Sequence, residues 1–133
     1  METSAFRLSF MGAAIAAAAL ALLHFTSRDP NSPMSEHDIG SVLGCYRAGN
    51  DLVRIDRHAL TVDIDGRVFE TNRLSFSYGR HISVSSNVFV RYDELRSRLT
   101  FEILDRDVSL FVRGRPDDRY LKFAGLRMTR QSC

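Results

Sequence analysis

The sequence predicts an all-β domain: a small antiparallel up-and-down barrel or curled sheet of about eight strands, preceded by an N-terminal transmembrane or signal helix. Three observations lead to this fold class. Apolar residues alternate with polar ones over most of the chain after residue 45, turn signals separate the alternating runs, and no stretch there has helical spacing. Successive side chains of a strand point to opposite faces, so each run can line a core while its neighbours meet water. Short strands joined by tight turns, without crossover helices, must be antiparallel.

The first element is an apolar segment. Residues 8–25, LSFMGAAIAAAALALLHF, carry no formal charge. As a helix this segment would extend about 27 Å, close to the ~30 Å hydrocarbon core of a bilayer. Cleavage after Ala21 would leave the apolar LLHF at the new N-terminus, so we expect residues 1–25 to be an uncleaved signal anchor, with a cleaved signal peptide as the alternative. The weak charge difference between Arg7 and the pair Arg28 and Asp29 favours a single pass through an inner membrane, with the domain on the extracytoplasmic (periplasmic) side. After cleavage the protein would instead be secreted or periplasmic.

A linker and the β-domain follow. Residues 26–38 contain two prolines and several small polar residues, which is typical of a tether. Within it, Ser35 followed by Asp38 predicts an N-cap and a short helical turn. We therefore expect a β-barrel domain over residues 39–133. Its strands are predicted near 44–48, 51–56, 59–64, 67–78, 81–92, 97–104, 107–113 and 119–127, with turns at Asp65-Gly66, Gly79-Arg80 and Asp105-Arg106.

A short helical turn followed by LGCYR resembles the start of lipocalin-like (calycin) barrels. Members of that family have Gly-x-Trp on the first strand, and an arginine from the last strand covers the aromatic ring. The resemblance implies that Gly44 and Tyr46 hold these positions, with Arg127 or Arg130 as the covering arginine. Tyr stands here where the family has Trp.

The two cysteines, Cys45 and Cys133, have three possible roles. Lipidation of Cys45 is disfavoured because a polar linker separates it from the apolar core that ends at Phe25. A catalytic thiolate is disfavoured because no histidine is adjacent to it. In a closed barrel the first strand pairs with the last, which would bring Cys45 near the chain end, so we predict a Cys45–Cys133 disulfide in an oxidising compartment. The alternatives are an unpaired Cys133 or an intermolecular bridge through it.

No motif identifies an enzyme. The four histidines, His24, His37, His58 and His81, lack metal-ligand spacing, and the carboxylate pairs near Asp63, Asp105 and Asp117 lie beside predicted turns. The sequence contains no glycine-rich phosphate loop and no nucleophile elbow. We expect no cofactor, no metal and no catalytic residues. The formal net charge of +2 predicts no strong attraction to nucleic acid.

These observations favour a non-enzymatic module, anchored in the membrane, that binds a protein or another component of the cell envelope. Phe69, Phe89 and Phe111 fall on the nominally polar sides of their strands and suggest a contact surface. Arg113, Arg115 and Arg119 of the segment RGRPDDR could extend that surface, or could belong to a solvated loop. The alternative function is a lipocalin-like carrier of a small apolar ligand, whose interior would be lined by Val84, Val90, Phe101 and Leu110.

Overall fold

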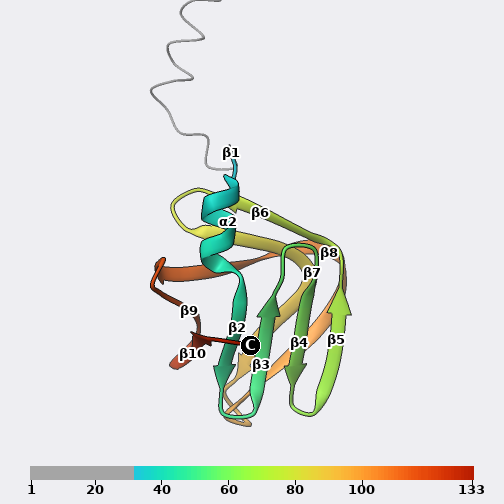
Figure 1. Ribbon diagram of the computed structural model, residues 1–133. Helices are drawn as coiled ribbons and strands as arrows, with labels where there is room; N and C mark the ends of the chain where they lie inside the picture. The colour runs from blue at the N-terminus through green and yellow to red at the C-terminus, as the bar shows by residue number, and fades with distance from the viewer. Residues whose placement is uncertain (1–31) are drawn as a thin grey trace, which may run out of the picture. The chain divides into compact units, whose positions relative to one another are not determined.

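The computed structural model describes residues 32–133, which form one helix and a single curled antiparallel sheet (Figure 1). The predicted anchor at 1–25 and the first part of the linker lie outside the described residues. Among the described residues, no helix is long and apolar enough to cross a membrane. Apart from the two-residue strand β1 (Ser32–Pro33), nine strands build a barrel-like sheet, so the predicted all-β antiparallel class is confirmed. They are β2 (Gly44–Ala48), β3 (Asp51–Ile55), β4 (Leu60–Ile64), β5 (Arg67–Thr71), β6 (Leu74–Tyr78), β7 (Ile82–Asp93), β8 (Arg98–Arg115), β9 (Asp118–Phe123) and β10 (Leu126–Gln131).

The strand order is β1-β6-β7-β8-β9-β10-β2-β3-β4-β5. The last strand, β10, pairs with β2, as expected for a meander that curls back on itself, and Gln131 lies opposite Cys45. One end of this strand order is β5, and the other end is β6 with the short β1 beside it. Strands β5 and β6 are consecutive in the chain. The seam of the barrel is therefore at the corner around residues 72–73 and not between the chain ends.

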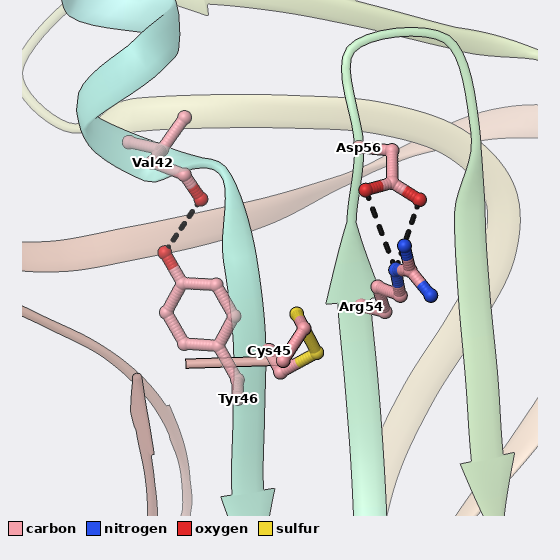
Figure 2. Close-up of a disulfide and its surroundings, with 6 residues drawn as sticks. Val42, Cys45, Tyr46, Arg54 and Asp56 are labelled. Carbon is pink, nitrogen blue, oxygen red and sulfur yellow. Dashed lines mark hydrogen bonds and ion pairs between the residues drawn. A yellow bond between two sulfur atoms is a disulfide. The ribbon is translucent and has the colours of Figure 1, made fainter. Parts of the chain in front are cut away.

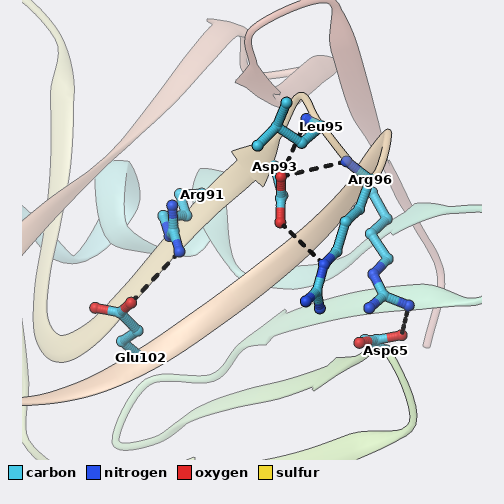
Figure 3. A network of polar contacts seen from close by, with 7 residues as sticks. Asp65, Arg91, Asp93, Leu95, Arg96 and Glu102 are labelled. Carbon is cyan, nitrogen blue, oxygen red and sulfur yellow. Dashed lines mark hydrogen bonds and ion pairs between the residues drawn. The ribbon is translucent and has the colours of Figure 1, made fainter.

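Side chains bridge this seam. The guanidinium of Arg67 on β5 lies 4.6 Å from the ring centroid of Phe101 on β8. Arg98, at the start of β8, forms an ion pair of 3.2 Å with Asp65 in the β4–β5 turn. Figure 3 shows this ion pair as the dashed line that ends at Asp65. Asp65 and Gly66 both have positive φ, 56° and 74°, as the predicted Asp-Gly hairpin turn requires. That turn therefore also carries one of the contacts that hold the curled sheet together.

Helix α2 (Glu36–Val42) precedes β2 and lies at the end of the barrel where β2 begins (Figure 1). Its start is the predicted one, because the Ser35 hydroxyl accepts a hydrogen bond from the Asp38 amide at 3.2 Å. Val42 at its end is fully buried, and Met34 before it is also in the core. The end of the predicted linker 26–38 thus contributes to the folded domain, from β1 onward.

The number of strands differs from the predicted eight for three local reasons. The predicted strand 67–78 is divided at a corner where the Thr71 hydroxyl accepts a hydrogen bond from the Arg73 amide at 3.1 Å. The predicted strand 119–127 is divided by a tight turn at Ala124, whose φ of 52° is unusual for alanine. In contrast, the predicted strands 97–104 and 107–113 are both parts of β8.

The Asp105-Arg106 turn is therefore a wrong prediction. Ser86 of β7 pairs with Val108, whereas Val88 pairs with Ile103, so a β-bulge of residues 104–107 on β8 faces the single residue Asn87. The bulge changes which alternate residues of β8 point inward: Leu99 and Phe101 before it, Val112 after it. In a sequence, such a change of phase is indistinguishable from two strands separated by a turn.

Candidate functional site

Tyr46 is the central residue of the end that α2 covers. Its side chain is fully buried, and its hydroxyl donates a hydrogen bond of 2.7 Å to the carbonyl oxygen of Val42 (Figure 2). Burial raises the pKa of Tyr46 from 10.0 to about 12, and the positive charges of Arg130 and Arg119 partly oppose this shift. The phenol is therefore neutral and acts as a donor that satisfies a carbonyl at the C-terminus of the helix.

Arg130 lies directly opposite Tyr46 in the β10–β2 pair. Its Nη1 donates to the carbonyl oxygen of Ser41, and its aliphatic stem passes over Gly44, where an added Cβ would be 3.4 Å from its Cγ. Arg127 is elsewhere: its guanidinium lies 3.8 Å from the ring centroid of Tyr120. Of the two arginines implied by the lipocalin resemblance, Arg130 is the one beside Gly44 and Tyr46.

Arg119 completes this end. It is only 9% exposed, Nη2 donates to the Ser41 hydroxyl at 3.0 Å, and Nη1 donates to the Gly114 carbonyl oxygen at 2.5 Å. Its Nε has no hydrogen-bond partner in the described structure. The sequence suggested either an exposed contact surface or a solvated loop for Arg119, Arg113 and Arg115; in the structure Arg119 is buried and its side chain reaches Ser41 of α2.

The two cysteines form the predicted disulfide, Cys45–Cys133, with Cα atoms 5.3 Å apart (Figure 2). The β10–β2 pairing produces this proximity, because Gln131 lies opposite Cys45 and the chain ends two residues later. The bond closes a loop with a sequence separation of 88 residues and joins the first long strand to the chain end.

The predicted aromatic surface is present only in part. Phe89 on β7 and Phe111 on β8 point outward and are 42% and 49% exposed. The ring of Phe111 contacts His81 edge-on, with centroids 6.0 Å apart. Phe69, in contrast, packs against the core. Phe89 and Phe111 remain as the exposed aromatic pair.

A groove of about 160 Å³ lies beside these two rings. It exists because β9 pairs with β8 only where residues 113–115 of β8 meet residues 118–120 of β9. Beyond these residues the paired register ends, and side chains of β7, β8 and β9 line the gap. We call it the outer groove; Phe89, Phe111, Arg113, Lys122 and Phe123 are among its lining residues, and no carboxylate of residues 32–133 lines it. Arg115 is not among them. Lys122, the only lysine of the chain, was not among the predicted contact residues.

The four residues proposed to line a ligand chamber belong to the packed interior. Val84, Val90 and Phe101 are buried members of the core cluster, and Leu110 packs against it. They lie side by side as cross-strand neighbours, with Val84 opposite Leu110 and Val90 opposite Phe101. Val90 and Leu110 also line the outer groove, whereas Val84 and Phe101 do not.

In each of the three carboxylate pairs singled out in the sequence, one member forms an ion pair on the surface. Asp65 pairs with Arg98, Asp107 with Arg73 at 2.7 Å, and Asp118 with Arg127 at 3.1 Å. Similar exposed pairs, such as Arg91 with Glu102, follow the β7–β8 ladder (Figure 3). Within residues 32–133, no group of three or more His, Cys, Asp or Glu side chains is arranged to hold a metal ion. His24 lies outside the described residues.

Comparisons of the chain with protein-family models, with curated proteins and with solved structures found no match.

Proposed function

We propose that this protein is a non-enzymatic binding module, held at the extracytoplasmic side of a membrane by residues 1–25, and that its outer groove contacts a protein partner. The observation that carries the proposal is the pair of half-exposed rings, Phe89 and Phe111, beside a groove that the described residues line with two cations and no carboxylate. Aromatic and arginine side chains around a small pocket are the groups that most often dominate protein interfaces.

The groove also indicates the chemistry of the partner. Its volume of about 160 Å³ suits one apolar side chain, and Arg113 and Lys122 favour carboxylates on either side of that anchor. We therefore expect a partner segment with an apolar residue flanked by acidic ones. The cations would mainly increase the association rate, and burial of the aromatic rings would mainly slow dissociation.

The proposed compartment rests on two features. The Cys45–Cys133 disulfide fits an oxidising, extracytoplasmic location. The uncharged segment 8–25 supplies an anchor or an export signal, and we favour the anchor with the domain in the periplasm.

A kinship with lipocalin-like barrels is part of the proposal. It is supported by Gly44, Tyr46 and Arg130, which meet at the helix-covered end of the barrel. The carrier function of that family is the weaker alternative here, because Val84 and Phe101 are packed in the core. Saturable binding of a fluorescent lipid that Phe101→Ala alters, and that Phe111→Ala does not, would favour the carrier.

The test is site-specific photo-crosslinking of the full-length protein in its host. A photoreactive phenylalanine analogue replaces Phe111 in one variant and Leu95 in another. Leu95 is the matched control because it is 99% exposed and does not line the groove. We expect a discrete protein adduct from position 111 and none from position 95, and we expect Lys122→Glu to reduce the adduct severalfold.

Three results would overturn the proposal: no adduct at position 111, the same adducts at both positions, or an adduct that Lys122→Glu leaves unchanged. Mass spectrometry of the adduct also tests the partner's chemistry. A crosslinked peptide without acidic residues near the site would contradict the electrostatic part of the proposal.

A further inference from the structure

A second cleft, of about 320 Å³, opens between the β6–β7 turn, the end of β8 and the start of β9. We call it the basic cleft because its lining residues include Arg80, His81, Arg113 and Arg119 and include no aspartate or glutamate. Tyr120 adds an aromatic ring to the wall. Three arginines thus line one small volume, and like charges placed close together repel one another unless an anion neutralises them.

The arginines of the basic cleft differ from most others in the domain. The described residues contain ion pairs of Arg54, Arg57, Arg73, Arg91, Arg96, Arg98 and Arg127 with carboxylates. Within residues 32–133, no such pair involves Arg80, Arg113 or Arg119. The described residues therefore supply no direct counterion to the positive charge of this cleft.

Arg119 is the strongest indication of a ligand. It is a buried cation, 9% exposed, and its hydrogen bonds within the described residues go to a hydroxyl and a carbonyl and not to a carboxylate. Asp117 and Asp118 line a neighbouring cleft that Arg119 also lines, but neither forms an ion pair with Arg119, and Asp118 pairs with Arg127. A buried charge without a counterion is costly, and an anion bound in the cleft would reduce that cost.

We propose that the basic cleft binds a phosphate-class oxyanion, either free or as the headgroup of a phosphorylated molecule. Guanidinium groups form paired hydrogen bonds with phosphate oxygens, and a doubly charged tetrahedral anion accepts donors from several directions. Hydrogen bonds to Ser41 and Gly114 hold the side chain of Arg119 in place, so its guanidinium is already oriented before a ligand arrives. The volume, at the lower end for small-molecule sites, leaves room for a group attached to the phosphate.

This site goes beyond the proposed protein contact and does not depend on it. The two share Arg113, but Arg80 lines only the basic cleft and Lys122 only the outer groove. Arg80→Gln should therefore weaken anion binding and leave the crosslink at position 111 unchanged. Lys122→Glu should do the reverse, so failure of one proposal is distinguishable from failure of the other.

The experiment is calorimetric titration of the full-length protein in neutral detergent with pyrophosphate and with inorganic phosphate. We expect one saturable site for at least one of these anions. Arg80→Gln and Arg113→Gln should each weaken it by about tenfold or more, since each removes a charged donor. Both side chains are exposed, so these variants should fold. The matched control is Arg115→Gln, which removes the same charge from an exposed position of β8 outside the cleft and should change affinity less than about twofold.

A third titrant, monomeric dihexanoyl phosphatidate, distinguishes the source of the phosphate. Tighter binding of phosphatidate than of both inorganic anions would assign the cleft to a lipid headgroup, and the opposite order would assign it to a soluble phosphate. The proposal is overturned if none of the three binds saturably. It is also overturned if Arg115→Gln weakens binding as much as Arg80→Gln, because the attraction would then be general and not a property of the cleft.

Discussion

Replacement of Tyr46 by phenylalanine tests how the helix-covered end of the barrel is held together. The phenyl ring fills nearly the same buried volume, so the main loss is the hydrogen bond of 2.7 Å to Val42. A typical hydrogen bond contributes about 1 kcal/mol, and a buried acceptor left without its donor costs up to about 3 kcal/mol. We therefore expect Tyr46→Phe to lower the free energy of unfolding by about 1–3 kcal/mol near neutral pH.

The same substitution should change the response to alkaline pH. The pKa of Tyr46 is raised from 10.0 to about 12 in the folded protein, mainly because burial disfavours the phenolate. Above about pH 10 the unfolded chain loses this proton first, so Tyr46 favours unfolding increasingly until the folded state also ionises near pH 12. At about 1.4 kcal/mol per pKa unit, this loss of stability amounts to about 3 kcal/mol. Phenylalanine lacks the proton, so the disadvantage of the variant should shrink from about pH 10 upward and should vanish or reverse by about pH 12.

The assay is urea denaturation followed by far-ultraviolet circular dichroism, for both proteins at several pH values from about 7 to 12. The difference between them isolates Tyr46, because the other three tyrosines and all arginines are common to both. Both cysteines of the chain are in the disulfide, so no free thiol is present to start exchange at high pH. A stability difference that stays constant across this range would refute the buried-phenol explanation. A difference of zero at neutral pH would refute the importance of the Val42 hydrogen bond.

Three further substitutions test other parts of the fold in the same denaturation assay. Cys133→Ser keeps the buried Cys45 but opens a loop of 88 residues, so it should lower the free energy of unfolding by up to about 4.6 kcal/mol in the chain-entropy estimate. A decrease below about 1 kcal/mol would mean that the disulfide constrains only a frayed segment around Cys133. Gly114→Ala should cost more than about 2 kcal/mol, because φ is 89° and the new Cβ would be 2.0 Å from the Asp118 carbonyl oxygen, and an unchanged midpoint would contradict this geometry. Gly40→Ala is the matched control in the exposed part of α2, with nothing within 4 Å of the new Cβ, and should stabilise by about 0.5–1 kcal/mol.

Local signals predicted much of this fold. The Ser35 cap, the Asp65-Gly66 turn and the alternation of Val84, Val88 and Val90 each depend on neighbouring residues, and each appears in the structure. The disulfide followed from one topological step, the pairing of the first long strand with the last. Such features are readable because the sequence period and the turn chemistry directly express backbone geometry.

The features that the sequence did not reveal depend on contacts between distant residues. Arg119 looks like one of several arginines in a charged loop, and its burial follows only from the approach of Ser41, 78 residues away. Likewise, Arg80 and Arg113 become neighbours only because the β6–β7 turn lies beside the end of β8. No periodicity or spacing in the sequence indicates these long-range contacts, so the basic cleft could not be predicted from the sequence.

Strand β8 explains why both candidate sites lie on the same part of the barrel. It pairs with β7 along most of its length, changes phase at the bulge, and then meets β9 over only three residue pairs, from Arg113 to Arg115. The short pairing leaves the outer groove on one side, and the end of the strand forms a wall of the basic cleft, with Arg113 lining both. The opposite edge of the sheet is bridged by Arg67 and Arg98, and the first and last strands are joined by the disulfide. The exposed rings Phe89 and Phe111 and the arginines of the basic cleft therefore lie where the regular sheet is interrupted, which is where a binding surface can vary without opening the core.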